Sequence, residues 1–192
     1  MKNRTGKPLS LAARERLRRS YRPKRVKILF VGESPPVSGR FFYQADSGLF
    51  RAIRETFIQA LPALKPALEN KEHFLRVFQG MDCYLFDLCG RPVDRLSAKA
   101  RREAWMKGQP RLTKTLRDLR PQIVVTVVRS VAGNVVRAQQ KAEWSGLHVE
   151  LPYPGRWHQH REEFAKGLVP LLRKNYSQDI VRRIMVGAES ET

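Results

Sequence analysis

The sequence is poor in cysteine and histidine, and each shortage excludes a class of protein. The 192 residues contain two cysteines, Cys83 and Cys89, and four histidines. Two cysteines exclude a disulfide scaffold, and they exclude a zinc or iron–sulfur site built from four cysteines of one chain. We expect both thiols to be reduced, as in a cytoplasmic or otherwise intracellular protein.

Long hydrophobic runs are also missing. No stretch approaches the roughly 18 consecutive apolar residues that a membrane-spanning helix needs. The N-terminus is basic, but neither an apolar segment nor a cleavage site follows it, so we expect no secretory signal peptide. The sequence therefore predicts a protein that does not associate with a membrane.

Acidic residues are scarce relative to basic ones. The chain has 37 Lys and Arg against 18 Asp and Glu, which gives a formal net charge of +19. This excess favours a polyanionic partner, and nucleic acid is the first candidate. Hydrophobic residues make up 42% of the chain, which is enough for a folded domain and argues against wholesale disorder.

The chain divides into a basic arm at 1–25, an α/β domain at 26–176, and a C-terminal helix with a polar tail at 177–192. In the arm, Ser10 to Ser20 predicts a short helix with Ser10 as its N-cap and a polar face of arginines. We interpret the arm as a phosphate-binding segment. A disordered basic tail without a specific role and an organelle transit peptide are the alternatives.

Apolar runs alternate with helical patterns through the domain. Strands are predicted at 26–31, 82–88, 122–128 and 147–151. Helices are predicted at 48–61, 72–78, 101–119, 130–140, 161–174 and 177–185. Gly108 and Pro110 are expected to break the 101–119 segment into two helices. The alternation predicts an α/β fold of three α/β/α layers around a central four-stranded parallel sheet.

Ligands of such sheets bind at the carboxyl ends of the strands, so the loops after the strands are informative. In the first loop, Gly32 permits close backbone approach and Glu33 supplies a carboxylate. The loop lacks the glycine spacing and the Lys-Ser/Thr pair of a phosphate loop. Phe41, Phe42 and Tyr43 follow, and we expect one of these rings to face a base and two to belong to the core.

Two later loops also carry polar groups. Asp87 ends an otherwise apolar strand, where a carboxylate is either paired or used. The structural alternatives for Asp87 are a helix cap and an ion pair with Arg91 or Arg95. His158 and His160 resemble metal ligands, but no cysteine or acid lies at a matching spacing. We therefore expect no metal and no cofactor, and a His or Arg of this loop contacting phosphate.

Motifs follow the predicted strands in a characteristic order. They are GESPP at 32–36, GRFF at 39–42, YLFD at 84–87 with RPVDR at 91–95, LRPQIVVT at 119–126, and LPYPG at 151–155. Together they resemble the motifs of the uracil-DNA glycosylase superfamily, over about residues 26–175. GESPP is most similar to the GEAPG form of the first motif.

The resemblance implies roles for particular residues. Phe42 lies on the phenylalanine of the G-R-P-F motif, which stacks on the flipped base. Asp87 lies on the asparagine that reads the base. Ser34 stands where the GQDPYH branch has its catalytic carboxylate, so Ser34 cannot be a strong base. Leu151 stands where the last motif has a histidine, and the iron–sulfur cysteines of the GEAPG branch are missing. The chain therefore resembles a divergent branch.

The implied function is that of a DNA glycosylase, which flips uracil or a related damaged base and hydrolyses its N-glycosidic bond in base excision repair. Bond cleavage leaves positive charge on the sugar and negative charge on the base, so the site needs a carboxylate and hydrogen-bond donors. We predict a monomer that binds DNA. The predicted catalytic residues are Glu33 and Ser34; the base-binding residues are Gly32, Phe42, Asp87 and His158. The predicted DNA-binding residues are Arg91, Tyr153, Arg156, Trp157, His160 and Arg161.

Two other functions compete with this one. A non-catalytic nucleic-acid-binding protein on the same fold is favoured by the residues found at Ser34 and Leu151. A nuclease would need clustered carboxylates for metal ions, and the sequence shows no such cluster.

Overall fold

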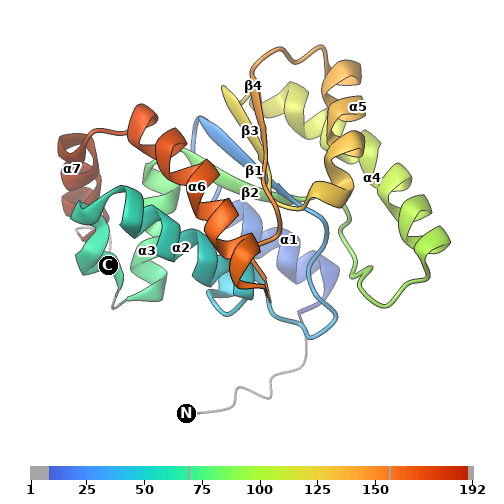
Figure 1. Cartoon of the computed structure of the whole chain (residues 1–192), viewed down its shortest axis with the longest axis horizontal. Helices are drawn as coiled ribbons and strands as arrows, with labels where there is room; N and C mark the ends of the chain where they lie inside the picture. Colours follow the sequence, from blue (N-terminus) through green and yellow to red (C-terminus); the bar gives the residue numbers. More distant parts are fainter. Residues whose placement is uncertain (1–8, 69, 156, 190–192) are drawn as a thin grey trace.

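A computed structural model describes residues 9–68, 70–155 and 157–189 of the chain. Its centre is one parallel sheet with the strand order β2-β1-β3-β4 (Figure 1). The strands are β1 (Ile28–Gly32), β2 (Cys83–Asp87), β3 (Ile123–Thr126) and β4 (Leu147–Glu150). The predicted four-stranded parallel sheet is confirmed, with each strand slightly shorter than its apolar run.

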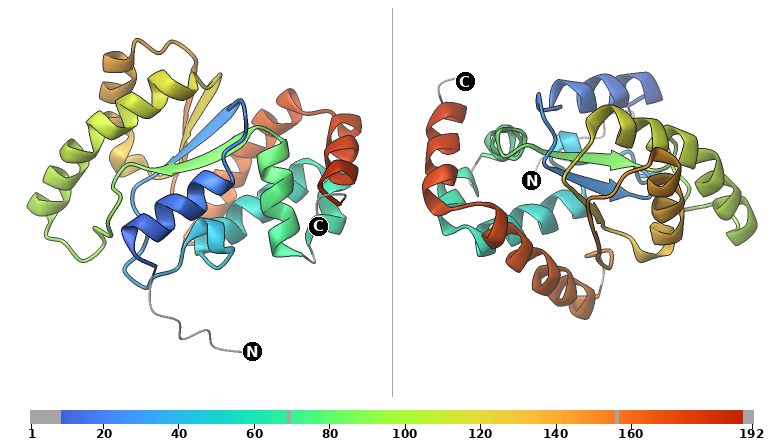
Figure 2. Two further views of the ribbon diagram at one scale, coloured as in Figure 1. Left: turned by 180° about the vertical axis from the view of Figure 1, so that it is seen from behind. Right: turned by 90° about the horizontal axis from the view of Figure 1, so that it is seen from above.

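Helices cover both faces of the sheet (Figures 1 and 2). One face carries α1 (Leu11–Ser20), α4 (Ala98–Leu119) and α5 (Ala132–Ala142). The other carries α2 (Gly48–Ala60), α3 (Lys71–Gly80), α6 (His158–Asn175) and α7 (Gln178–Glu189). Short 3-10 helices lie at η1 (Phe42–Gln44), η2 (Pro62–Leu68) and η3 (Arg129–Val131). The three-layer α/β/α architecture is therefore confirmed.

The strand sequences explain which strands lie in the middle. Every residue of β1 and β3 is buried, as expected for β-branched and aromatic runs covered on both faces. In β4, Leu147 and Glu150 are exposed, which is typical of an edge strand. On the α2 side the core is rich in phenylalanine, with Phe30, Phe57 and Phe78 in mutual ring contact.

The expected break in the 101–119 segment is wrong, because α4 is one continuous helix. Pro110 lies on its exposed side, where water can solvate the carbonyl of Met106 that loses its helical partner. Gly108 is needed for packing, since a Cβ there would overlap the carbonyl oxygen of Leu88. Both residues are therefore compatible with a continuous helix at these positions.

The arm folds back onto the domain from residue 9 onward. Helix α1 begins after its N-cap Ser10, as predicted. Arg18 is buried and donates a hydrogen bond to the Tyr84 hydroxyl at 2.6 Å. Arg14 is also buried and donates to the carbonyl oxygen of Leu9 at 3.0 Å. Two arginines of the predicted phosphate-binding face are therefore occupied inside the fold.

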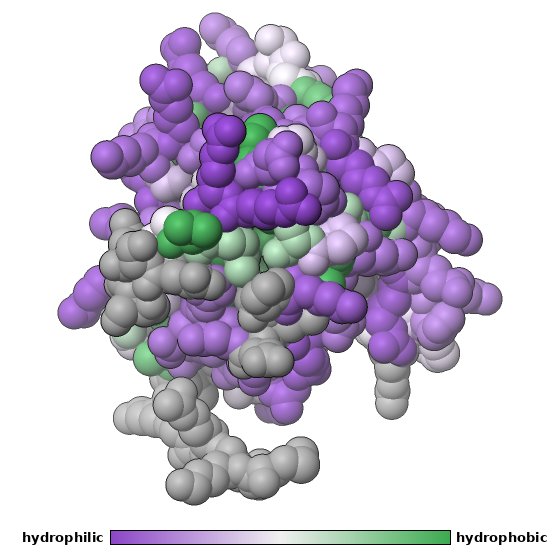
Figure 3. All heavy atoms as spheres, turned by 90° about the vertical axis from the view of Figure 1, so that its left-hand side faces the viewer, coloured by the Kyte–Doolittle hydropathy of each residue, from purple (hydrophilic) through white to green (hydrophobic). Residues whose placement is uncertain are grey.

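The surface of the described part of the molecule is mainly polar. The side that carries α7 is mostly hydrophilic, with only narrow hydrophobic patches between the polar groups (Figure 3). Within residues 9–68, 70–155 and 157–189, none of the helices combines the length and the apolar character that crossing a bilayer requires.

Candidate functional site

A pocket of about 470 Å³ lies at the carboxyl ends of β1 and β2. The loop after β1, the start of α2, the end of β2 and the first half of α4 form its walls. The lining residues used below are Gly32, Glu33, Ser34, Phe41, Phe42, Asp87, Asp94, Arg101 and Tyr153. This is the place where parallel α/β sheets bind their ligands, and the volume suits a small organic group.

Gly32 and Asp87 lie side by side at the edge of the sheet. They are register partners in the β1–β2 ladder. A Cβ built on Gly32 would lie 2.5 Å from Oδ1 of Asp87, which is closer than real atoms approach. Glycine at this position therefore leaves room for the Asp87 carboxyl.

Gly32→Ala is expected to destabilise the protein by about 1–3 kcal/mol, because the added methyl group overlaps the Asp87 carboxyl. Urea denaturation of both proteins measures this loss. The double variant Gly32→Ala/Asp87→Ala is expected to recover part of it, since the second change removes the overlapping atoms. An additive double variant would contradict this account.

Asp87 is a carboxyl without a hydrogen-bond partner. Within the part of the chain that the structure describes, no group bonds to its side-chain oxygens, whereas its backbone carbonyl accepts from Arg111. Burial raises the pKa of Asp87 to about 7, although the charges of Arg111, Arg18 and Arg14 oppose the rise. The carboxyl is therefore neutral in an appreciable fraction of molecules near neutral pH.

The raised pKa of Asp87 predicts a pH-dependent effect on stability. Folding binds a proton at this carboxyl, so the stability that Asp87 contributes at low pH is lost as the pH rises toward about 7. Asp87→Asn is therefore expected to stabilise the protein more at about pH 8 than at about pH 4. A tenfold difference in proton affinity between the folded and unfolded states corresponds to about 1.4 kcal/mol. Differential scanning fluorimetry of both proteins at both pH values measures this, and an equal change at the two values would contradict it.

Glu33 is held by α4. Arg101 donates to both carboxylate oxygens of Glu33, from Nε and Nη2, each at 2.5 Å. Trp105 donates from Nε1 to the same carboxylate at 2.7 Å. The Glu33 hydrogen bonds raise the pKa of Arg101. The site thus contains a fixed carboxylate, paired with Arg101, beside the pocket; three of its about four lone-pair positions are used, and one is left for another donor.

Arg101 and Trp105 are residues of the candidate site that the sequence did not lead us to predict. The signal that was available is their spacing of four residues, which puts both side chains on one face of the predicted helix. The sequence does not indicate that this face turns toward Glu33.

Ser34 joins the two loops of the pocket. Its hydroxyl accepts a hydrogen bond from the backbone N–H of Val93 at 3.3 Å. Asp94 reaches back in the other direction and accepts from the backbone N–H of Val37 at 3.2 Å. These bonds set the position of the first loop relative to β2.

Two aromatic rings line the pocket. Phe41 and Phe42 are 4% and 3% exposed, and both belong to the wall. The Phe42 ring packs edge-on against Phe50, with centroids 5.7 Å apart. Tyr43 lies in the interior, where its hydroxyl donates to the Leu85 carbonyl and accepts from the Leu85 N–H. Two rings of the three therefore line the pocket, where one was expected to face a ligand.

The fourth loop, which follows β4, brings Tyr153 to the pocket, whereas the histidines that come after it lie elsewhere. Tyr153 is 43% exposed and lines the wall. His158, in contrast, does not line it; its side chain is 77% exposed, with Nδ1 3.5 Å from the carboxylate of Glu162. Trp157 is 65% exposed at the N-cap of α6. His160, Arg161 and Arg91 are exposed, and Arg156 lies outside the described residues.

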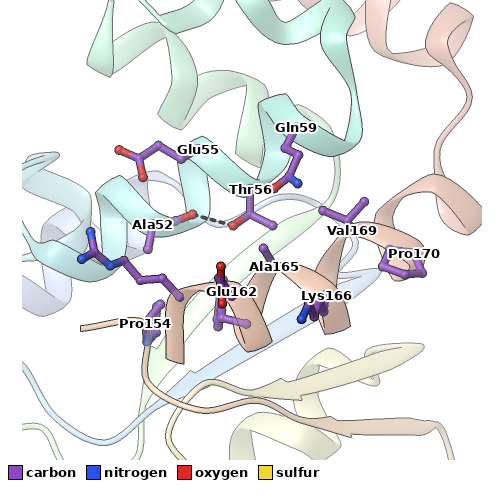
Figure 4. Close-up of a pocket in the computed structure, with 12 residues that line it drawn as sticks. Ala52, Glu55, Thr56, Gln59, Pro154, Glu162, Ala165, Lys166, Val169 and Pro170 are labelled. Atoms are coloured by element: carbon purple, nitrogen blue, oxygen red, sulfur yellow. Dashed lines mark hydrogen bonds between the residues drawn. The ribbon is translucent and has the colours of Figure 1, made fainter. Parts of the chain in front are cut away.

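A second cavity, of about 540 Å³, lies between α2 and α6 (Figure 4). Thr56 uses its hydroxyl within its own helix, donating to the Ala52 carbonyl at 2.8 Å. The other polar groups belong to the outward faces of the two helices, as with Glu55 on α2 and Lys166 on α6. Without a converging set of chemical groups, this cavity is a weaker candidate than the pocket at the sheet edge.

A comparison with protein-family models agrees with the motif order. The model described as the uracil DNA glycosylase superfamily matches residues 4–179. The chain belongs to the uracil DNA glycosylase superfamily. None of the curated proteins compared with the chain matches it. Superfamily membership supports a general role as a DNA glycosylase in DNA repair, with DNA as the partner.

Leu151 is the clearest departure from the superfamily motifs. It is 4% exposed and packs against α6 at Gly167. The position that carries a histidine in the superfamily motif is therefore a core position in this chain.

The iron–sulfur cluster of the GEAPG branch does not fit this chain. The chain has two cysteines, whereas such a cluster needs four thiolates. Both are buried free thiols, and burial raises the pKa of Cys83 to about 12 and that of Cys89 to about 11. Among the described residues, no group of three or more His, Cys, Asp or Glu side chains is placed to hold a metal ion.

Proposed function

We propose that the protein is a DNA glycosylase that removes uracil or a related damaged base by hydrolysing its N-glycosidic bond. The observation that carries this proposal is the Asp87 carboxyl, which lines the pocket beside Gly32 and has no hydrogen-bond partner within the described residues. Asp87 keeps part of its surface open to the pocket, so its carboxyl is available to a ligand. Superfamily membership supports the same conclusion.

Asp87 reads the base in its neutral form. A protonated carboxyl offers one O–H donor and one carbonyl acceptor, the same pair that an asparagine side chain offers. Uracil presents a donor at N3–H and an acceptor at O4, and hypoxanthine presents the same pattern. An ionised Asp87 would accept from N3–H but would set a second lone pair against O4. The pKa of about 7 keeps the neutral form available.

Glu33 stabilises the sugar. The bond between C1′ and the base nitrogen breaks with its electron pair on the base, and water then adds its oxygen to C1′ and loses a proton. Positive charge develops on the sugar in the transition state. Glu33 is a carboxylate fixed by Arg101 and Trp105, so it stabilises this charge without having to reorganise. Its one remaining lone-pair position accepts a hydrogen bond from the attacking water.

Phe41 and Phe42 hold the flipped base by stacking. Removing a base from the duplex costs a few kcal/mol, and stacking on an aromatic ring returns on the order of 1–3 kcal/mol. Phe42 is fixed by its contacts with Phe50 and Phe78, so the ring is already in place when a base arrives.

The proposal is tested with single- and double-stranded oligonucleotides that carry uracil, hypoxanthine or xanthine at one position. After incubation with the protein, alkali cleaves the strand wherever a base has been released. Strand breaks at the modified position of any of these substrates, and their loss in Glu33→Gln, are the expected result.

Undamaged oligonucleotides of the same sequence serve as the control for contaminating nucleases. Binding of the modified DNA without any base release would overturn the enzymatic proposal and favour a non-catalytic DNA-binding protein. The buried Leu151 in the last motif is the observation that supports this second candidate.

A further inference from the structure

The first half of α4 has two opposite faces with different environments. It projects away from the body of the domain in Figure 1 and in the left view of Figure 2. One face carries Arg101 and Trp105, which bind Glu33 at the pocket. The opposite face carries Lys99, Arg102 and Lys107, and all three are exposed. Helical spacing puts these three cations on one side, three to five residues apart.

The cations of this outer face are only partly neutralised by the protein. Within the described residues none of the three forms a salt bridge, and Glu103, one helical turn from Lys99 and from Lys107, is the one acid among them, so three cations and one acid leave the face positive. The second half of the same helix differs, because Lys114 pairs with Asp118 at 2.9 Å. Unpaired like charges that lie close together repel each other, so they indicate an anionic partner.

We propose that the outer face of α4, formed by Lys99, Arg102 and Lys107, binds the phosphate backbone of DNA. That the anionic partner is DNA rests on the superfamily to which the chain belongs. The contact itself is electrostatic and independent of sequence, so it also forms on undamaged DNA. Met106, 64% exposed between Arg102 and Lys107, offers an apolar contact to a deoxyribose.

The test compares two triple variants that lose the same charge. The first is Lys99→Ala/Arg102→Ala/Lys107→Ala. The control is Lys24→Ala/Lys174→Ala/Arg183→Ala, which removes exposed cations near the opposite ends of the strands, before β1, at the end of α6 and in α7. Binding of each protein to a fluorescein-labelled undamaged duplex is followed by fluorescence anisotropy between about 50 and 200 mM KCl.

The α4 variant is expected to bind at least tenfold more weakly than the control at the lowest salt concentration. The slope of log K against log[KCl] is expected to fall by about 2 to 3, since each lost phosphate contact removes about 0.9. Lys99→Arg/Lys107→Arg keeps the charges and is expected to bind like the unmodified protein. Equal weakening of both triple variants, or unchanged binding of the α4 variant, would overturn the proposal.

The proposed function is tested by a different measurement, the release of the base from modified DNA. Uracil release depends on the pocket, whereas binding of an undamaged duplex depends on the surface of the protein. A protein that binds through α4 but releases no base would retain this inference and lose the enzymatic proposal. Circular dichroism of both triple variants checks that each is folded.

Discussion

Glu33→Gln is expected to lower the rate of base release by about 100-fold or more, with little change in DNA binding. The substitution keeps the size of the side chain but removes the negative charge that stabilises the sugar cation, and one well-placed group of this kind contributes about 10²–10³ to the rate. It also leaves Arg101 without its carboxylate partner. Single-turnover excision with excess protein measures the chemical step separately from binding.

Trp105→Phe is the matched control for Glu33→Gln. It removes one of the three hydrogen bonds to the Glu33 carboxylate but retains the charge and the Arg101 pair. Its rate is therefore expected to lie between those of the unmodified protein and Glu33→Gln. If Glu33→Gln released the base as fast as the unmodified protein, Glu33 would not act on the sugar.

Uracil excision is expected to fall steeply as the pH rises above 7, and Asp87→Asn is expected to abolish this fall. Only the neutral carboxyl can donate to O4, and a pKa of about 7 leaves an ever smaller neutral fraction at higher pH. Above about pH 8 the neutral fraction decreases about tenfold per pH unit, and the rate should follow it. An asparagine offers donor and acceptor at every pH in this range.

Single-turnover rates from about pH 6 to about pH 9 check this prediction, on uracil and on hypoxanthine substrates in parallel. Both bases present the same donor and acceptor pattern, so both profiles should bend near the same pH. A decline that persists unchanged in Asp87→Asn would assign the titration to another group and leave Asp87 without a role in reading the base.

Most of the sheet could be predicted from the sequence because its strands are short, continuous apolar runs. The N-cap of α1 could also be predicted, since Ser10 precedes a helical run and its hydroxyl accepts from the Ala13 N–H. The continuity of α4 could not. Its glycine and proline are tolerated because of a close approach to Leu88 and an exposed flank, and both are tertiary facts.

The candidate site was predictable where a residue belongs to a loop motif and unpredictable where it depends on packing. Glu33 follows one predicted strand and Asp87 lies near the end of another, so their common position at the sheet edge follows from the topology. The partner of Glu33 comes from a helix 68 residues further along the chain, and no local pattern connects the two. The fourth loop contains histidines that suggest chemistry, yet His158 points to solvent and Tyr153 takes the place at the pocket.

Helix α1 also has a consequence for the proton affinity of the pocket. Arg18 of α1 and Arg111 of α4 both lie over the Phe86 ring, at 4.7 and 4.4 Å from its centroid, one residue before Asp87. Glu15 of α1 bonds to both arginines and so holds them in place. The positive charges of Arg14, Arg18 and Arg111 limit the rise in the pKa of Asp87. A part of the chain's excess positive charge therefore faces inward, and the N-terminal helix adjusts the ionisation of a carboxyl at the sheet edge.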